Sequence, residues 1–442
     1  MTTVTAHRLW RNTRYLIWLV SDTSKGMAAA LFGFAIPLLA LIITNDPAQA
    51  GIVGAAAMVA RLLATLMGGI LADRHPRIAL MLWGSLLGIL LAGAFTALAL
   101  TDSLTFVTLL VIDVLLAARS GLFDVAGESA IKEIVPDDAM GRAQAANQGR
   151  DAALQLAGGP LGGLLLGVGG WLIGVAMTVC HVIAALTAWM LERGRSTAAG
   201  ENGDEAPALR RAALEHAAPA ADDPGFDTAS VWREMREGFT WLLSRPDLGG
   251  VLVITTMINL GFNAAITTVI YALQQDGYSE LMIGTISAGI GIAMLVGAFV
   301  APLLVPRIGA GVLTIAGLAV AAVAVIGLSF VTTPWAIIAV LGGAVLLLPS
   351  LNAGMMGYFM VATPTHLLGR AGSAAGVLGM GAMPLAPLIA GFGLTVLGRD
   401  GTILICAALC LIAVGLAVGN RALRALPVES RWAEHARQYE VG

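Results

Sequence analysis

Charge is scarce in this sequence. Asp, Glu, Lys and Arg make up 12 % of its 442 residues, against about 25 % in a typical soluble domain. Hydrophobic residues make up 57 %, and the mean hydropathy is +0.83. So small a charged share excludes a water-soluble enzyme, a nucleic-acid-binding protein and a disordered chain. Most of the chain must therefore have lipid as its solvent.

Cysteine is also scarce, with three residues in the whole chain. Cys180, Cys406 and Cys410 all fall inside apolar segments, and the last two are too far apart along a helix for a disulfide. We expect all three to be small core residues. The spans contain no H-E-x-x-H metal motif and no G-x-S-x-G nucleophile motif, and His181 is isolated, so we expect it to be a satisfied packing residue. The sequence thus predicts no enzyme activity, no metal site and no cofactor.

Long apolar runs fill most of the sequence. A membrane-spanning helix needs about 20 mainly apolar residues. Runs of that length occur at about 15–43, 50–72, 78–100, 104–126, 143–166, 171–191, 247–274, 281–304, 311–330, 335–360, 371–395 and 401–420. The first run continues to about Thr44 without a convincing small-residue cleavage site, so we expect no cleaved signal peptide. The sequence therefore predicts an all-α polytopic membrane protein with 12 transmembrane helices.

The basic residues lie almost entirely on one side of the predicted membrane. With a cytoplasmic N-terminus, the inner segments hold 20 of the 25 Lys and Arg residues, and the outer turns hold only Arg399. Because basic residues favour the cytoplasmic side, we expect a multi-pass protein of the inner or plasma membrane with both termini in the cytoplasm.

A long polar segment divides the predicted spans into two halves. Residues 192–246 form a cytoplasmic linker, in which 229–244 has apolar residues on one side and predicts an amphipathic helix on the inner membrane surface. We predict a six-helix bundle at 1–191, this linker, a second six-helix bundle at 247–421 and a cytoplasmic tail at 422–442.

The two predicted halves share a sequence pattern. Pro136 with Gly141-Arg142-Ala143, before the fifth span, recurs at a shift of 228 residues as Pro364 with Gly369-Arg370-Ala371, before the eleventh. A parallel repeat implies two bundles related by a pseudo-twofold axis along the membrane normal, with binding between them near mid-membrane.

Two motifs carry a resemblance to a known family. The turn after the second span, Gly69-Ile70-Leu71-Ala72-Asp73-Arg74-His75-Pro76-Arg77, is similar to the G-x-L-A-D-R-x-G-R signature of the major facilitator superfamily. The fifth span ends in Gly158-Gly159-Pro160-Leu161-Gly162-Gly163, which resembles the G-P-x-x-G-G antiporter motif with its proline one place late. Residues 44–48 and 135–148 are similar to the drug and siderophore exporter branch of that superfamily.

The resemblance implies a secondary active transporter that works by alternating access. It implies proton-coupled efflux, by antiport, of amphipathic small molecules such as drugs or siderophore-like compounds, an activity that confers antibiotic resistance. The expected partners are a small amphipathic substrate, protons and the lipid bilayer, and we expect a monomer that binds no nucleic acid. The alternative is a flippase of the same fold for lysophospholipids or other lipids, with Arg61 as its headgroup site.

The signature turn predicts an inner gate formed by Gly69, Asp73, Arg74 and Arg77. Asp73 can cap the N-terminus of a facing helix, where the helix dipole favours a negative charge. Arg74 and Arg77 can pair with acids or carbonyl groups of the same inner layer. The alternative is that both arginines only anchor the turn to anionic lipid headgroups.

Ionisable residues inside the spans are costly and usually functional. All of them fall in the first six spans: Asp22, Lys25, Arg61, Asp113, Arg119, Asp124, Arg150 and Asp151. We expect Arg61 to pair with Asp113 at mid-membrane, which makes Asp113 the leading proton-coupling candidate. The alternative is a static buried pair that fixes helix packing.

The remaining charges of the spans suggest local pairs. Asp22, Asp124 and Asp151 are further proton-coupling candidates, and Asp22 can also pair with Lys25 at i,i+3. We expect Arg150 to pair locally and Arg119 to reach the inner gate at Asp73. In the fifth span a polar stripe of Gln144, Gln148, Asp151, Gln155 and Gly159 predicts either helix packing or a cavity wall.

The predicted spans of the second half contain Asn, Met and aromatic residues that could bind a substrate. Its candidate substrate-cavity residues are Asn259, Asn263, Tyr271, Asn352, Met356 and Phe359. Met and aromatic side chains adapt to varied apolar ligands. The alternative is that they are ordinary packing or lipid-facing residues.

Overall fold

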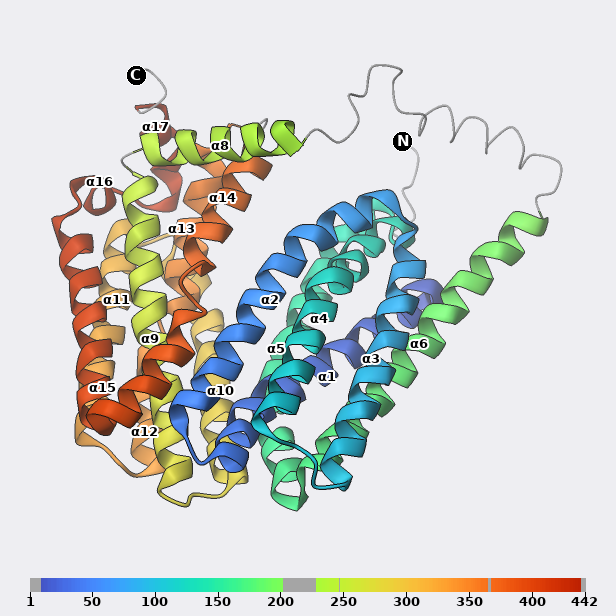
Figure 1. The fold of residues 1–442 in the computed structure, drawn as a ribbon. Coiled ribbons are helices and arrows are strands. Elements are labelled where there is room, and N and C mark those ends of the chain that lie inside the picture. The colour runs from blue at the N-terminus through green and yellow to red at the C-terminus, as the bar shows by residue number, and fades with distance from the viewer. Residues whose placement is uncertain (1–8, 202–227, 246, 365–366, 439–442) are drawn as a thin grey trace.

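The computed structural model describes residues 9–201, 228–245, 247–364 and 367–438. They form helices and turns, with no strand among them (Figure 1). The first half consists of α1 (Thr13–Thr44), α2 (Pro47–Arg74), α3 (Arg77–Leu100), α4 (Phe106–Ile134), α5 (Asp137–Val168) and α6 (Gly170–Glu201). The long helices of the second half are α8 (Thr228–Ser244), α9 (Gly249–Gln275), α10 (Glu280–Leu304), α11 (Ala310–Gly327), α12 (Pro334–Val345), α13 (Leu348–Ala362), α14 (Leu368–Met380) and α15 (Leu385–Gly419), followed by the short α16 (Arg421–Arg424) and α17 (Trp432–Arg437).

The helices that can cross a membrane agree with the predicted spans. Eleven segments of the described residues are long and apolar enough, and the last covers Arg370–Gly419. Gly398, with a φ of 69°, interrupts that segment and divides it into two lengths of about 20 residues or more, each sufficient to cross. The all-α polytopic fold predicted from the sequence is confirmed. The tenth span is α12 with α13, and the eleventh is α14 with the first part of α15.

The ends of the helices follow from local chemistry. Asn45 ends α1 in the left-handed conformation, with a φ of 48°, which Asn tolerates better than most residues. Asp46 then caps α2 by accepting a hydrogen bond of 2.8 Å from the backbone N–H of Ala48, and Pro47 occupies the first helical turn, where its missing N–H costs nothing. Two residues thus suffice to reverse the chain between α1 and α2.

The two halves meet close to one membrane face. A Cβ atom on Gly51 in α2 would collide with the carbonyl group of Pro387 in α15, and one on Gly391 with that of Pro47. The second contact is between α5 and α10, where a Cβ atom on Gly163 would collide with the carbonyl group of Glu280. Backbones this close require glycine. We call this side the opposite face, because α8, α16 and α17 lie at the other one, the α8 face (Figure 1).

Toward the α8 face the halves separate. Gly159 of α5 is buried against Ser287 of α10. Further along the same side of α5, toward the α8 face, the stripe is exposed: Gln144, Gln148, Asp151 and Gln155. A row of exposed polar side chains on the side that faces α10 indicates a wall of an opening rather than helix packing. The structure is therefore closed at the opposite face and open toward the α8 face (Figure 1).

The glycines of the antiporter-like motif serve two neighbours. Gly159 and Gly163 face α10, whereas Gly158 lies against Ala30 and Gly162 against Phe34, both in α1. Pro160 lies inside α5, between Gly158-Gly159 and Gly162-Gly163 in the sequence. The motif thus lets α5 pack closely against α1 of its own half on one side and against α10 of the other half on the adjacent side.

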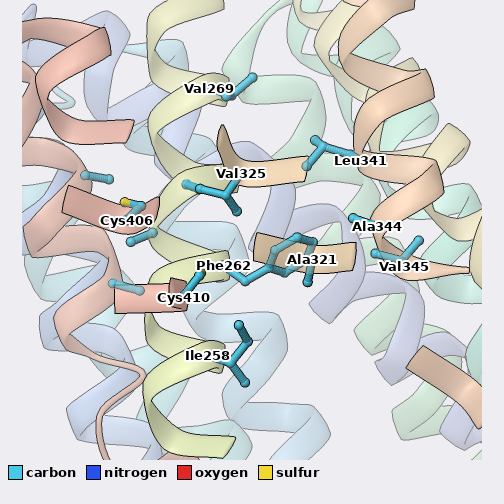
Figure 2. Packing of buried hydrophobic residues seen from close by; sticks show 14 of the residues in the cluster. Ile258, Phe262, Val269, Ala321, Val325, Leu341, Ala344, Val345, Cys406 and Cys410 are labelled. Atoms are coloured by element: carbon cyan, nitrogen blue, oxygen red, sulfur yellow. The ribbon is translucent and has the colours of Figure 1, made fainter. Parts of the chain in front are cut away.

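The second half has a core of apolar side chains drawn from α9, α11, α12 and α15 (Figure 2). Phe262 of α9 lies in its middle with Val325 of α11 and Leu341 of α12. Cys406 and Cys410 are free and buried in the same cluster, which confirms them as small core residues, and Cys180 is also free.

A buried ionic cluster holds the second half together at the α8 face. Asp247, between α8 and α9, accepts hydrogen bonds of 2.9 and 2.8 Å from Arg245 and one of 2.5 Å from the Tyr358 hydroxyl of α13. Asp247 and Arg245 are both buried. Burial raises the pKa of Asp247, but the hydrogen bonds from Arg245 and Tyr358 outweigh it, so that the pKa of this carboxyl is lowered. Sequence reasoning missed this cluster, which is an ion pair fully removed from water.

The amphipathic helix α8 belongs to the second half. Leu242 is buried, Phe239 is half-buried, and Glu237 forms an ion pair of 2.7 Å with Arg370 of α14. The side chains of Val231 and Met235, also expected on its apolar side, lie outside the described residues. In Figure 1, α8 lies across the end of the bundle.

We predict that Asp247→Asn lowers the unfolding free energy by about 3 kcal/mol, because removing one partner leaves the other charge buried. The contribution of Asp247 is complete above the ordinary carboxyl pKa of about 3.9 and is lost as the pH falls through the lowered folded value. Thermal unfolding in detergent should show a gap between variant and wild type that is constant from about pH 5 upward and shrinks below about pH 4. Asp400→Asn, at an exposed carboxylate, is the control and should change little.

A second prediction concerns the closed contact. Gly163→Leu should force α5 from α10 and open the opposite face, since its side chain meets backbone that cannot move aside. Spin labels on the exposed residues Ser103 and Tyr278, in a background without the native cysteines, should report a longer separation. Gly93→Leu is the matched control, because nothing lies within 4 Å of a Cβ atom there. An unchanged distance in Gly163→Leu would contradict the proposed tight contact.

Candidate functional site

A cavity of about 210 Å³ lies inside the first half. Four helices, α1, α2, α4 and α6, supply all of its walls. Most of its lining is apolar or small: Ala28, Ala29, Phe32, Gly33, Ile36, Pro37, Gly54, Ala57, Met58, Leu116, Ala117 and Met177. Its polar lining is Arg61, Asp113, Arg119, Ser120 and His181. The cavity therefore combines an apolar wall with a few polar groups, as small-molecule sites do.

Asp113 of α4 is the most isolated of these groups. Its side chain is 5 % exposed, and no hydrogen bond or ion pair joins it to any residue that the structure describes. Tyr271 of α9, in the other half, is close enough for the Asp113 charge to act on it. A buried carboxylate without a partner is costly, so Asp113 is the member of the cavity with most to gain from a proton or a cation.

Arg61 of α2 lines the same cavity with an exposed side chain. The predicted ion pair between Arg61 and Asp113 is wrong, since no such pair forms among the described residues. The two side chains belong to one cavity but lie at different depths. Arg61 is instead near enough to Asp124 for its charge to act there.

Asp124 is held by other groups of α4. Ser120 donates a hydrogen bond of 2.5 Å to its carboxylate, and Arg119 lies 3.8 Å away. Their spacing of four residues places Ser120 and Asp124 on one face of α4. Arg119 is buried and also donates a 3.2 Å hydrogen bond to the carbonyl group of Gly84. Its described partners thus lie inside the first half, and the expected partner Asp73 has a side chain outside the described residues.

His181 of α6 differs from the expectation of a satisfied packing residue. It is 1 % exposed, it packs against Gly88 of α3, and its Nδ1 atom has no hydrogen-bond partner in the described part of the chain. It also lines the cavity. No signal in the sequence separates such a histidine from an ordinary core residue.

A network of ion pairs lies nearer the α8 face, between α1 and α5. Asp22 lies 3.1 Å from Lys25, which confirms the predicted i,i+3 pair, and 2.7 Å from Arg150. Arg150 also lies 2.8 Å from Asp151, in agreement with local pairing. Trp18 covers the network: its ring lies 5.8 Å from the Arg150 guanidinium, and its indole N–H donates to the carbonyl group of Gly127. These charges are largely satisfied by one another.

The inner-gate residues are described only in part. Arg77 donates a 3.3 Å hydrogen bond to the carbonyl group of Ser129 and lies 3.6 Å from Glu133, both in α4. These are the kinds of partner that the sequence predicted, within the layer at the α8 face. Arg74 is exposed, Gly69 has nothing within 4 Å of a Cβ position, and the side chain of Asp73 lies outside the described residues. A gating role stays a prediction.

The candidate cavity residues of the second half do not line this cavity. Tyr271 is buried near Asp113, and Asn263 donates a hydrogen bond of 2.9 Å to the carbonyl group of Asn259 within α9. Asn352 and Met356 are exposed on α13, and Phe359 is half-buried there. Their part in substrate binding stays a prediction.

The Asp22 network offers a test of what its charges are for. Asp22→Asn leaves Lys25 and Arg150 buried with one charge fewer, and we predict a loss of about 3 kcal/mol in unfolding free energy, measured by thermal unfolding. The double variant Asp22→Leu with Lys25→Met leaves Arg150 paired with Asp151 and should recover most of this loss. A single variant as stable as the wild type would contradict the pairing.

Comparisons with known proteins agree with this geometry. No curated protein sequence matches the chain. Among solved structures, a bacterial homologue of the iron transporter ferroportin in its inward-facing state has a TM-score of 0.67 at 16 % identity over 93 % of this chain and 99 % of that one. A bacterial metal transporter has a TM-score of 0.61 at 14 % identity, with the same two coverages. A POT family transporter in complex with 5-aminolevulinic acid has a TM-score of 0.64 at 12 % identity, over 91 % of this chain and 95 % of that one.

At these identities the three structures show a shared fold and nothing more specific. The family match is more direct, since residues 23–385 match the Major Facilitator Superfamily. That range includes the signature turn after α2, the glycines of α5 and every residue of the cavity. The chain is a multi-pass membrane protein that belongs to the major facilitator superfamily.

Proposed function

We propose that this secondary transporter exports amphipathic small molecules in exchange for protons, and that Asp113 carries the proton. The observation that supports this most is the position of Asp113, buried without a partner in the wall of an apolar cavity. The ionised form has no described cation or donor to stabilise it there. Loss or gain of a proton at Asp113 therefore changes the charge of the cavity by a full unit, which is what a coupling site must do.

The orientation follows from the basic residues. The α8 face carries Arg74, Arg77, Arg370, Arg421 and Arg424 at helix ends. The opposite face has Arg399, which donates hydrogen bonds to the carbonyl groups of Leu328 and Val331. We therefore place the α8 face in the cytoplasm of the inner or plasma membrane, so that this structure is a state open to the inside and ready to load substrate.

The chemistry of the cavity favours an organic substrate over a metal ion. Two of the comparison structures are described as metal transporters. In the part of this chain that the structure describes, no group of three or more His, Cys, Asp or Glu side chains could hold a metal ion. Two guanidinium groups, Arg61 and Arg119, line the cavity beside a single carboxylate. A single carboxylate supplies too few oxygen ligands for a divalent cation.

Lipid flipping is the second candidate, and Arg61 is the observation that favours it. An exposed arginine without an ion-pair partner among the described residues could meet a phosphate headgroup. The cavity, at about 210 Å³, is smaller than the usual ligand site of about 300–1,000 Å³. A lipid with long tails would have to leave them outside it, so we favour the export of small molecules.

The test of coupling uses the purified protein in vesicles with an imposed pH gradient. Small aromatic cations and zwitterions that the cavity can hold are the substrate panel, with a macrolide and a siderophore as larger compounds, and uphill accumulation and substrate exchange are measured for each. We predict that Asp113→Asn reduces gradient-driven accumulation at least tenfold while exchange without a gradient continues, because a neutral amide cannot carry the proton.

The matched control is Asp400→Asn, which neutralises an exposed carboxylate at the opposite face. It should transport like the wild type. Full gradient-driven accumulation in Asp113→Asn would refute the coupling role of Asp113. Transport by the wild type that ignores the pH gradient for every substrate would refute the proton-driven function.

A further inference from the structure

The cavity holds two opposite charges that do not meet. Asp113 is a carboxylate without a described partner, and Arg61 is a guanidinium without a described ion-pair partner. The other charged side chain of the lining, Arg119, is already engaged by Asp124, which also accepts a hydrogen bond from Ser120. Asp113 and Arg61 are therefore the two charges of the cavity that remain available to a ligand.

The two charges differ in depth. Both α2 and α4 begin at the opposite face, at Pro47 and Phe106. Arg61 comes fourteen residues after the start of α2, and Asp113 comes seven residues after the start of α4. At about 1.5 Å of rise per residue, the two Cα positions differ by up to about 10 Å along the helices. Since no ion pair joins the two side chains, a ligand that meets both must carry its opposite charges on separate parts of its body.

The remaining lining is suited to an aromatic skeleton. Phe32 of α1, Met58 of α2 and Met177 of α6 line the cavity together with small residues. Thioether and aromatic side chains pack well against flat apolar groups. His181 adds one polar atom without a partner. Apart from the charged groups, Ser120 and His181, the lining is thus apolar.

We propose that the substrates are amphoteric: a carboxylate or similar anionic group pairs with Arg61, an ammonium group pairs with Asp113, and an apolar body spans the distance between them. This inference rests on the proposed function in one respect, because the ammonium group and the proton then compete for Asp113. Competition for one carboxylate produces exchange of substrate for proton, whereas Arg61 holds the anionic group in either case.

A zwitterionic lipid headgroup has the same two charges, so the source of the ligand must be distinguished. In phosphatidylethanolamine a two-carbon bridge joins the phosphate oxygen to the ammonium group. The acyl chains attached to that headgroup would not fit in a cavity of about 210 Å³. The geometry therefore favours a free small molecule whose charges lie at opposite ends of a rigid body.

The test is a binding series on one skeleton. The probes are 6-(aminomethyl)-2-naphthoic acid, its methyl ester, which is only a cation, and its N-acetyl derivative, which is only an anion. Binding to the full-length protein in phosphatidylglycerol nanodiscs is measured by calorimetry. We expect the wild type to bind the amphoteric parent at least tenfold more tightly than either derivative.

The variants assign each end of the ligand. Arg61→Ala should bind the parent and the ester equally while still preferring both to the N-acetyl form, and Arg61→Lys should retain part of the preference for the acid. Asp113→Asn should bind the parent and the N-acetyl form equally while still preferring both to the ester. Arg236→Ala, at an exposed arginine on α8, and Asp400→Asn are controls that should match the wild type.

The outcomes separate this inference from the proposed function. Equal binding of parent and ester by the wild type, or a preference for the acid that survives Arg61→Ala, overturns the amphoteric substrate. The inference is also overturned, in favour of a lipid, if lysophosphatidylethanolamine displaces the parent compound and binds more tightly than the parent compound does. If the binding pattern holds but the vesicles show no proton-driven transport, the proposed coupling fails and the substrate class stands.

Discussion

A charge inside a bilayer has to be met by a partner, and this constraint organises the first half of the molecule. Lys25 and Arg150 share Asp22, and Arg119 and Ser120 share Asp124. The first set of contacts joins α1 to α5, whereas the second lies within α4, from which Arg119 also reaches the carbonyl group of Gly84 in α3. Asp113 and Arg61 are the exceptions, and both line the cavity between α1, α2, α4 and α6. The lack of an ion-pair partner for Asp113 and for Arg61 is consistent with the ligand proposed above, which would pair with both.

The second half satisfies the same constraint by keeping charge out of the membrane. Its core consists of apolar side chains, many of them from α9, α11, α12 and α15, with small residues where backbones approach (Figure 2). Its buried ion pair, Arg245 with Asp247, lies before the start of α9 rather than within it. The C-terminal tail adds to this end, since the carbonyl groups of Leu426 and Pro427 accept hydrogen bonds from the first N–H groups of α11. The helices of this half are therefore held together by the apolar core and, at the α8 face, by the ion pair and the hydrogen bonds of the tail.

The sequence predicted what depends on spacing along one helix, and it failed where two helices had to be placed against each other. The spans, the Asp22–Lys25 pair and the shared face of Ser120 and Asp124 all follow from helical periodicity. The pairing of Arg61 with Asp113 was inferred from depth alone, but rotation and tilt of α2 and α4 decide which side chains meet. His181 and the Asp247–Tyr358 contact were missed for the same reason. In the latter the partners are 111 residues apart, and no local pattern connects them.

The contacts of α5 indicate which interface must open for transport. On one side α5 is tied to α1 by the Asp22–Arg150 ion pair and by the close fit of Gly158 and Gly162 against Ala30 and Phe34. On the other side it meets α10 through Gly159 and Gly163, in contacts of backbone and small side chains, and no ion pair joins the two helices among the described residues. Breaking the first interface would strand buried charges, whereas opening the second costs mainly van der Waals contact. In the transport cycle proposed above, the first half would therefore move as a unit, and Asp113 and Arg61 would keep their separation while the side from which they are reached changes.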